Sequence, residues 1–421
     1  MLDAGLVLYL GLVVLFLWRF VSGWRLCGAW LEYANYCMLL YMLLLVLNVW
    51  AIYSFLSLAL RQEGQEVFKP LPPWMRPLML GTPAAALVTY VLAFLQTGQH
   101  VNEIRRGAGT LKHDRAVQII ALPAVFGCTA MNALAKVFQG AAGLDIEAEL
   151  VGTSILELGS LAHAGNSTHA NNTEVYMAQV ETCYQVGDLY EAWALYQFCK
   201  MTLEILRGSL EAIATEKQKT DERTVVASGL LMAHKSLADI AYTGVFMFLV
   251  VCCAQAGWSL YLLTFTNPED NWSDYNSQMG RFQAAGLVTS MAAIYNLNTV
   301  EMEFHAFFEG YGPLLKFLTV KLLLSLAYFQ KGCVYVLQTV NRFLPFLLQN
   351  IIASVPFVSQ LVSMKDTEFY MFYSSLILYE CVLGVFLHWF AWPSDESFYE
   401  ELEHDIGGQG AEERKPLLEK A

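Results

Sequence analysis

Long apolar runs recur along the chain, and several of them are about as long as a membrane is thick. A helix needs roughly 20 apolar residues to cross the hydrocarbon of a bilayer. Hydrophobic residues make up 56% of the 421 residues here, against 15% charged residues. Inside a bilayer every backbone N–H and C=O group must be satisfied within its own segment, which a helix achieves. The sequence therefore predicts an all-α fold, a polytopic membrane bundle.

We expect nine membrane helices separated by polar segments. They cover residues 3–20, 34–58, 79–100, 117–138, 184–206, 238–264, the two sides of a Gly-Tyr-Gly-Pro hinge at 310–313, and 368–391. Residues 344–362 are apolar but contain prolines and amides, so we expect them at the interface or half inserted. The chain then divides into two N-terminal helices with a Pro-rich linker (1–75), a seven-helix core (76–395) and a cytosolic tail, acidic and then mixed in charge, that is expected to be disordered (396–421).

Two independent patterns agree on the sidedness of the chain. Three glycosylation sequons begin at Asn166, Asn171 and Asn271, in loops that are poor in Lys and Arg. With nine helices these loops fall on one side, and the loops dense in Lys and Arg fall on the other, as the positive-inside rule requires. We therefore expect the N-terminus outside or in a lumen, the C-terminus in the cytosol, and glycosylation at the three asparagines.

The tail contains a short acidic dileucine pattern. Glu413 precedes Leu417 and Leu418 by a few residues, which resembles the sorting signal that clathrin adaptors read. A flexible cytosolic tail is where such a signal works. The pattern predicts a clathrin adaptor as a partner of the tail.

Polar and ionisable residues occur inside the predicted helices, most densely in the helix pair around the hinge. Charges at membrane depth are costly unless they pair, reach the interface or line a wet cavity. We therefore predict a solute path through the bundle. Its candidate residues are Asp188, Glu191, Asn296, Glu301, His305, Lys321, Gln330, Lys331, Glu380 and His388.

Several of these groups also have a structural interpretation. We expect Glu301 to pair with Lys321 across the hinge, either as a gate or as a buried structural pair. Lys316 is expected to reach the membrane interface as an anchor. His388, near a helix end, is expected to cap that end or to lie at the interface. One helical face on the third predicted helix, expected to bind a neighbouring helix, consists of Gln96, Gln99, His100 and Glu103.

Composition and motifs argue against several other classes of function. A net charge of −13 disfavours nucleic-acid binding. The nine cysteines are scattered without a CxxC or Cys/His cluster, so we expect neither a metal site nor a disulfide framework. The sequence contains no phosphate-binding G-x-x-x-x-G-K-[ST] run, so transport would be facilitated or ion-coupled. The helices lack HExxH and GxSxG patterns, so we expect no enzyme and no cofactor.

Three blocks of sequence resemble the patterns of one family. They are Gln99-His100 with Asp114-Arg115 and Gln118 ahead of Pro123; Asp188 to Ala192 with Tyr196 and Phe198; and Tyr295-Asn296, Pro313 to Lys321, Phe329-Gln330, Glu380, His388 and Phe390 to Pro393. Across residues 79–395 they are similar to the organic solute transporter alpha and transmembrane protein 184 family. The seven helices of that family would correspond to the third to ninth helices predicted here.

The resemblance implies passive transport of steroid-like or bile-acid-like organic anions for one branch, which works with a small single-pass partner. For the transmembrane protein 184 branch it implies an endosomal, vacuolar or plasma-membrane protein with a long tail, and the tail here favours that branch. We therefore expect facilitated transport of small amphipathic organic solutes, by a protein with a single-pass partner subunit or as a homo-oligomer. The alternatives are a seven-helix receptor and a trafficking or scaffold protein without transport activity.

Overall fold

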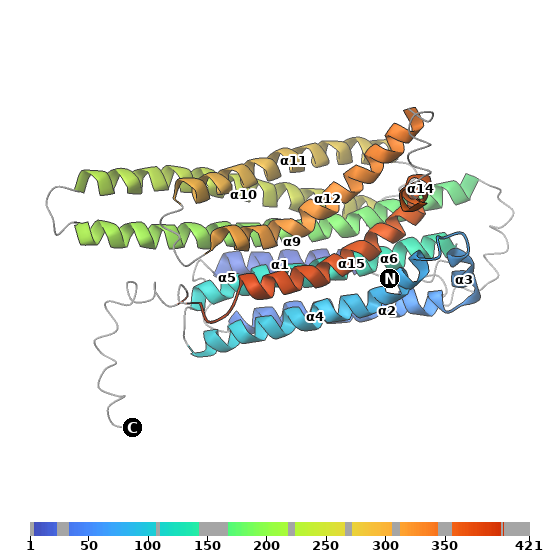
Figure 1. Ribbon diagram of the computed structural model, residues 1–421, viewed down its shortest axis with the longest axis horizontal. Coiled ribbons are helices and arrows are strands. Elements are labelled where there is room, and N and C mark those ends of the chain that lie inside the picture. Colours follow the sequence, from blue (N-terminus) through green and yellow to red (C-terminus); the bar gives the residue numbers. More distant parts are fainter. Residues whose placement is uncertain are drawn as a thin grey trace, which may run out of the picture.

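Helices make up the regular structure of the residues that the computed structural model describes. These residues are 4–22, 33–106, 110–142, 167–217, 224–265, 272–304, 312–343, 356–396 and 399. Figure 1 shows the long helices lying side by side along one axis. The prediction of an all-α membrane bundle is confirmed.

The helices run up and down the bundle in chain order (Figure 1). They are α1 (Ala4–Ser22), α2 (Tyr33–Ala59), α3 (Gln62–Phe68), α4 (Met75–Arg106), α5 (Thr110–Ile120), α6 (Leu122–Ala142), α9 (Ser167–Lys217), α10 (Thr224–Phe265), α11 (Trp272–Glu303), α12 (Pro313–Phe343), α14 (Pro356–Ser363) and α15 (Asp366–Ala391). The ends of α4 and α15 and the starts of α5 and α12 lie at one end of the bundle. That end carries one of the polar clusters described below.

Five of the described helical segments are long and apolar enough to cross a membrane. By length and composition they are Cys37–Ala59, Met75–Arg106, Leu111–Ala142, Lys235–Thr264 and Asp366–Ala391. Each overlaps one of the helices expected from the sequence. The first predicted helix corresponds to α1, whose apolar stretch is the shorter segment Gly5–Trp18.

Some elements differ from the prediction in length. The helix expected over 184–206 is part of α9, which has 51 residues and spans roughly 75 Å at 1.5 Å per residue. Together with α10 it projects beyond the other helices at one end (Figure 1). The Pro-rich linker contains the short helix α3. Of the segment 344–362, expected at the interface, residues 356–362 belong to the short helix α14, and residues 344–355 lie outside the described part.

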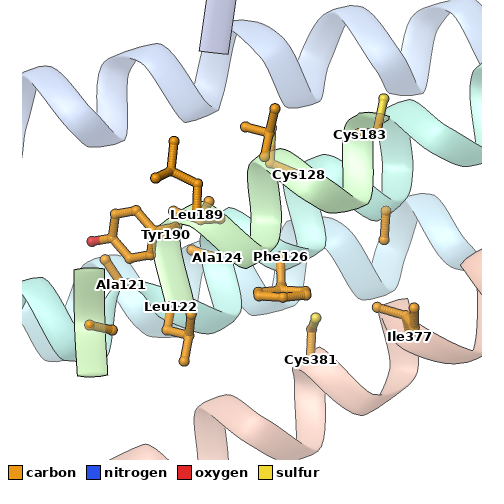
Figure 2. Close-up of a cluster of buried hydrophobic side chains, with 14 of the residues drawn as sticks. Ala121, Leu122, Ala124, Phe126, Cys128, Cys183, Leu189, Tyr190, Ile377 and Cys381 are labelled. Carbon is orange, nitrogen blue, oxygen red and sulfur yellow. The ribbon is translucent and has the colours of Figure 1, made fainter. Parts of the chain in front are cut away.

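The core of the bundle is built around α6. Every residue from Leu122 to Ala135 is buried, because α6 packs against α2, α4, α9 and α15. Its sequence contains six Ala and two Gly, small residues that allow helix backbones to approach closely in membranes. Figure 2 shows the side chains of α6 meeting those of α9 and α15, among them Tyr190 and Cys381. This packing fixes α9 and α15, two of the helices against which α12 lies.

Two glycines of α4 provide a matched test of this packing. A Cβ on Gly81 would overlap the hydroxyl of Tyr379, which donates a hydrogen bond to the carbonyl of Leu78 at 2.9 Å, whereas a Cβ on Gly98 would meet nothing within 4 Å. We expect Gly81→Ala to cost about 1–3 kcal/mol through overpacking and the displaced hydrogen bond, and Gly98→Ala to cost nothing. Thermal unfolding in detergent measures both, and equal midpoints for the two variants would contradict this packing.

Candidate functional site

Helix α12 carries three polar side chains at successive levels, and each binds a different part of the protein. They are Lys316, Lys321 and Gln330. The first and last are separated by roughly 20 Å along the helix axis at 1.5 Å per residue. Because α12 packs against α9 and α15, these groups are held between helices rather than in water.

The middle level is a buried ion pair between α12 and α9. Lys321 Nζ donates to Glu191 Oε1 at 2.8 Å, and the exposed fractions of the two side chains are 7% and 0%. The same ammonium lies 3.5 Å from Ser290 Oγ of α11 and 5.2 Å from the ring centre of Phe248 of α10. Side chains from three neighbouring helices therefore surround the ammonium of Lys321.

The carboxylate of Glu191 uses only one of its two oxygens in this pair. Glu191 Oε2 is buried and has no hydrogen-bond partner among the described residues. Asp188, one turn earlier on α9, is half-buried, and the thiol of Cys252 on α10 interacts electrostatically with Asp188, Glu191 and Lys321. The site thus combines an ammonium with an unused carboxylate oxygen, and both groups are buried inside the bundle.

The third level joins α12 to α15. Gln330 Nε2 donates to Glu380 Oε1, and Glu380 is 6% exposed. The second oxygen of Glu380 and the side-chain oxygen of Gln330 are buried without a hydrogen-bond partner among the described residues. Two neighbouring acceptors that lack a donor are expensive in an apolar interior, so this level also has the capacity to bind a donor.

His388 lies two turns below Glu380 on the same stripe of α15 and is fully buried. Its Nδ1 lies 2.9 Å from the carbonyl of Gly384, to which it donates, and its Nε2 is buried without a partner among the described residues. The carbonyl of His388 accepts a hydrogen bond from Gln96 Nε2 of α4 at 2.9 Å. Contrary to the expectation from the sequence, the side chain of His388 therefore neither caps the helix nor reaches the interface.

The first level of α12 belongs to a cluster at one end of the bundle, which we call the end cluster. It joins α4, α5 and α12 to the segment after α15. Its residues are Gln96, His100, His113, Lys316, Thr319, Trp392, Glu396 and Tyr399.

Lys316 is buried in this cluster. Its Nζ lies 2.9 and 2.8 Å from the two oxygens of Glu396 and 5.4 Å from the ring centre of Trp392. The expectation that Lys316 reaches the interface as an anchor is wrong, because Glu396 supplies a counter-charge inside the protein. Burial raises the pKa of the Glu396 carboxyl, and the hydrogen bond and charge of Lys316 oppose that rise.

The histidines of the end cluster bind the segment that follows α15. His100 Nε2 donates to the carbonyl of Trp392 at 3.1 Å, and His100 Nδ1 lies 3.0 Å from His113 Nδ1. The ring of Tyr399 stacks on His113 with 3.9 Å between ring centres. Glu396 and Tyr399 belong to the tail predicted to be disordered, and here they pack against the core.

The helix-binding face predicted on α4 is present in part. Gln96 and His100 bind α15 and the residues after it, as the prediction requires. Gln99 is exposed, and Glu103 pairs with the exposed Arg106 of its own helix at 2.6 Å. Only two of the four residues therefore join helices.

Glu301 is not the partner of Lys321. The ammonium of Lys321 contacts Glu191 of α9 instead, and Glu301 is half-buried in the last turn of α11. Asn296 Nδ2 lies 3.4 Å from the carbonyl of Ile240 and ties α11 to α10. The remaining candidates lie outside the residues or side chains that the structure describes: His305, Lys331, Asn166, Asn171, Asn271, Glu413, Leu417 and Leu418.

The polar contacts of two α5 residues, Arg115 and Gln118, were missed by reasoning from the sequence. Arg115 of α5, 4% exposed, binds both oxygens of Glu204 on α9. Gln118 of α5 accepts a hydrogen bond from Trp193 Nε1 at 2.9 Å, and its carbonyl accepts one from Tyr190 at 2.8 Å. Arg115 and Gln118 lie in the first block of family resemblance, and that block was the only signal for these contacts.

The comparison with protein families covers the helices that hold most of these groups. A family model described as organic solute transporter Ostalpha matches residues 173–397, more than half of the chain. The match begins in α9 and ends after α15, so it includes Glu191, Lys321, Gln330 and Glu380, whereas the first block of resemblance lies before it. No curated protein and no solved structure matches the chain. Because the match covers more than half of the chain and the structure is a bundle of apolar helices, the chain belongs to the Ostalpha family of organic solute transporters.

Proposed function

We propose that this protein carries small amphipathic organic solutes, steroid-like or bile-acid-like anions, across a membrane by facilitated transport, along the interfaces that α12 makes with α9 and α15. The observation that carries the proposal is the set of buried polar contacts of α12, with Glu191 and Glu380 each keeping one oxygen unused. Family membership supports transport as the general activity.

The energetics of buried charge favour a functional role for these groups. Desolvating an ion pair often costs more than the pair returns, so apolar residues in its place are frequently as stable or more stable. Ionisable groups within a membrane bundle therefore most often mark solute or ion pathways. We assign the path to Asp188, Glu191, Lys321, Gln330, Glu380 and His388.

The remaining features of the proposal follow from the sequence. The protein would belong to the transmembrane protein 184 branch and lie in the plasma, endosomal or vacuolar membrane, with its N-terminus outside or luminal. It would be glycosylated on the outer loops and recognised by a clathrin adaptor through its cytosolic tail. A single-pass partner subunit or a second copy of the chain would complete the transporter.

Uptake into vesicles tests the proposed activity. The protein is purified, reconstituted into phosphatidylcholine vesicles and shown to be folded by circular dichroism. Labelled steroid conjugates are then expected to enter faster than into empty vesicles, with saturation as the concentration rises. Entry at the rate of empty vesicles, with the protein folded, would contradict the proposal.

Glu380→Gln distinguishes a path residue from a structural one. Glutamine keeps the size and the hydrogen bond with Gln330 but removes the negative charge, so the fold is expected to survive. Uptake is expected to fall about tenfold, the order of effect of one hydrogen bond to a charged group. Tyr379→Phe, which removes a hydroxyl on the adjacent residue of α15, serves as the control for general damage to this helix. Unchanged uptake by Glu380→Gln would exclude Glu380 from the path. A Glu380→Gln protein that folds poorly, and whose remaining folded fraction takes up solute at the wild-type rate, would favour a scaffold role.

A further inference from the structure

The hydrogen bond between Gln330 and Glu380 joins α12 to α15 near the middle of both helices, and it lacks one donor. Gln330 Nε2 donates to Glu380 Oε1, while Gln330 Oε1 and Glu380 Oε2 are both buried without a hydrogen-bond partner among the described residues. If Glu380 is ionised, both of these oxygens are acceptors only. Buried acceptors without a donor are costly, so the ionised pair is chemically incomplete.

A single proton on Glu380 Oε2 would satisfy both oxygens. A protonated carboxyl gains an O–H donor and keeps its carbonyl oxygen as an acceptor. When an amide N–H donates to that carbonyl oxygen, the amide oxygen and the acid hydroxyl can face each other. The hydroxyl of Glu380 would then donate to Gln330 Oε1, which closes a ring of two hydrogen bonds between α12 and α15.

The other carboxylates that contact α12 differ from Glu380 in having a counter-charge. Glu191 and Glu396 also have one oxygen without a hydrogen-bond partner among the described residues. Each of them, however, has a lysine ammonium 2.8 Å away, from Lys321 and Lys316 respectively. An opposite charge at this distance favours the ionised form of a carboxyl. The partner of Glu380 is a neutral amide.

The helices around Glu380 place no described cation beside its carboxyl. The neighbouring thiol of Cys381 interacts with it electrostatically and carries no positive charge. A Cβ on Gly127 of α6 would lie 3.9 Å from Cys381 and 3.7 Å from the uncharged Thr89 of α4, so these residues share one level. Lys136 of α6 lies roughly 13 Å along the helix axis from Gly127, and the side chain of Lys331 on α12 lies outside the described part.

From these contacts we infer that Glu380 is a proton-binding site, protonated in the resting protein, and that release of its proton opens the interface between α12 and α15. On release the O–H bond at Glu380 Oε2 breaks, the proton passes to water that enters the interface, and the electron pair stays on the carboxylate. One hydrogen bond then remains, and a negative oxygen faces Gln330 Oε1. The inference rests on the proposed function and adds its regulation: acid holds α12 on α15, and alkali releases it.

Infrared difference spectroscopy tests the proton without measuring transport. In the full-length protein in phosphatidylcholine vesicles at neutral pH, the carbonyl stretch of a protonated carboxylic acid is expected, and Glu380→Gln is expected to remove it. Glu211→Gln, at an exposed carboxylate that pairs with Arg207, is the control and is expected to keep it. Gln330→Met is expected to move the stretch to higher frequency, because the acid carbonyl then accepts no hydrogen bond from the amide. A Glu380→Gln spectrum that loses an ionised-carboxylate band instead would overturn the proton site.

Uptake at two pH values, equal on both sides of the vesicle membrane, tests the effect of the proton on transport. The probe is a labelled steroid sulfate, whose charge is the same at both values. Wild-type uptake is expected to be faster at about pH 8 than at about pH 6, by at most about tenfold per pH unit, the largest change in the ionised fraction of one carboxyl. Glu380→Gln keeps both hydrogen bonds of the ring without a releasable proton, so its uptake is expected to be slow and equal at both values.

Two further variants separate the ring from general effects of pH. Gln330→Met cannot form the ring, so its uptake at the lower pH is expected to approach its uptake at the higher one. Tyr379→Phe leaves Gln330 and Glu380 in place and is expected to keep the wild-type ratio of the two rates. If Glu380→Gln failed to fold, the infrared shift and the lost pH dependence of Gln330→Met would still decide the question.

The possible outcomes distinguish this inference from the proposed function. Equal wild-type uptake at both pH values would overturn the role of the proton and leave facilitated transport intact. A folded protein that shows the acid band but takes up no solute at either pH would contradict the proposed function and leave the proton site standing. A protein without the acid band, whose uptake depends on added Na⁺ or K⁺, would show that a metal cation occupies the site and would overturn the inference.

Discussion

Replacing Glu191 by Ala is expected to destabilise the protein by about 3–5 kcal/mol, because it leaves the ammonium of Lys321 buried without its counter-charge. Lys321 is 6% exposed and contacts side chains of α9, α10 and α11, so its ammonium is largely shielded from water. Ser290 Oγ, its other hydrogen-bond contact among the described residues, is neutral and 3.5 Å away. The midpoint of thermal unfolding in detergent measures the effect, with the yield of folded monodisperse protein as a second readout.

The double variant E191Q/K321Q shows whether the stability lost in Glu191→Ala comes from the unpaired charge of Lys321. With both charges removed, E191Q/K321Q is expected to regain most of the stability that Glu191→Ala loses, since neutral pairs of similar volume are often tolerated at such sites. The exposed pair of Arg207 and Glu211 on α9, which are 2.6 Å apart, provides the control, and Glu211→Ala is expected to cost at most about 1 kcal/mol. A double variant as unstable as the single one would show that side-chain packing, not charge, is what Glu191 provides.

Trp392→Ala is expected to cost about 3–5 kcal/mol, the range for truncating a large buried aromatic side chain. Trp392 is fully buried. Its Nε1 donates to Thr319 at 3.3 Å, and its ring lies beside Lys316 and Phe198. Removing this side chain would therefore disrupt the contacts of the end cluster with α12 and with the segment after α15 at the same time.

Phe390 is a suitable control for Trp392. It lies two residues earlier, in the last turn of α15, and is 75% exposed, so Phe390→Ala is expected to change the unfolding midpoint little. Limited proteolysis adds a local readout, because cleavage after residue 392 is expected to accelerate in Trp392→Ala and not in Phe390→Ala. Similar unfolding midpoints for the two variants would contradict the packing described for the end cluster.

The sequence predicted the fold class and the apolar helices because both depend on local properties. A run of about 20 apolar residues must be helical in lipid whatever its neighbours are. Helix lengths were predicted less well. The extension of α9 beyond residue 206 carries several charged residues, so a rule based on hydrophobicity ends the helix too early. The start of α10 at Thr224 lies ahead of His234 and Lys235, the polar residues after which the same rule begins the helix too late.

The partners of the charged residues depend on tertiary packing and were harder to predict. The hinge at 310–313 favoured Glu301 as the partner of Lys321, because the two are near in sequence. The observed partner, Glu191, is 130 residues away on α9, which only the packing of α12 against α9 brings into reach. The positions of Lys321, Glu191, Gln330 and Glu380 in apolar surroundings nevertheless marked them as candidates.

The end cluster shows a second limit of prediction from the sequence. A lysine near a helix end usually extends toward water, and this is the expectation for Lys316. Glu396 lies beyond the last apolar residue of α15, in a stretch whose composition resembles a disordered tail, so no local pattern indicates that it folds back. The packing of Trp392 and Tyr399 on α12 and on α5 supplies the missing constraint.

Counterflow is the measurement that tests facilitated transport by this bundle most directly. Phosphatidylcholine vesicles that contain the protein are loaded with an unlabelled steroid conjugate. They are then diluted into a trace of the same conjugate in labelled form, without any ion gradient. A facilitated carrier is expected to accumulate the label transiently above its equilibrium level, and this overshoot is expected to shrink in Glu380→Gln. A label that only equilibrates, at the rate of empty vesicles, would contradict facilitated transport.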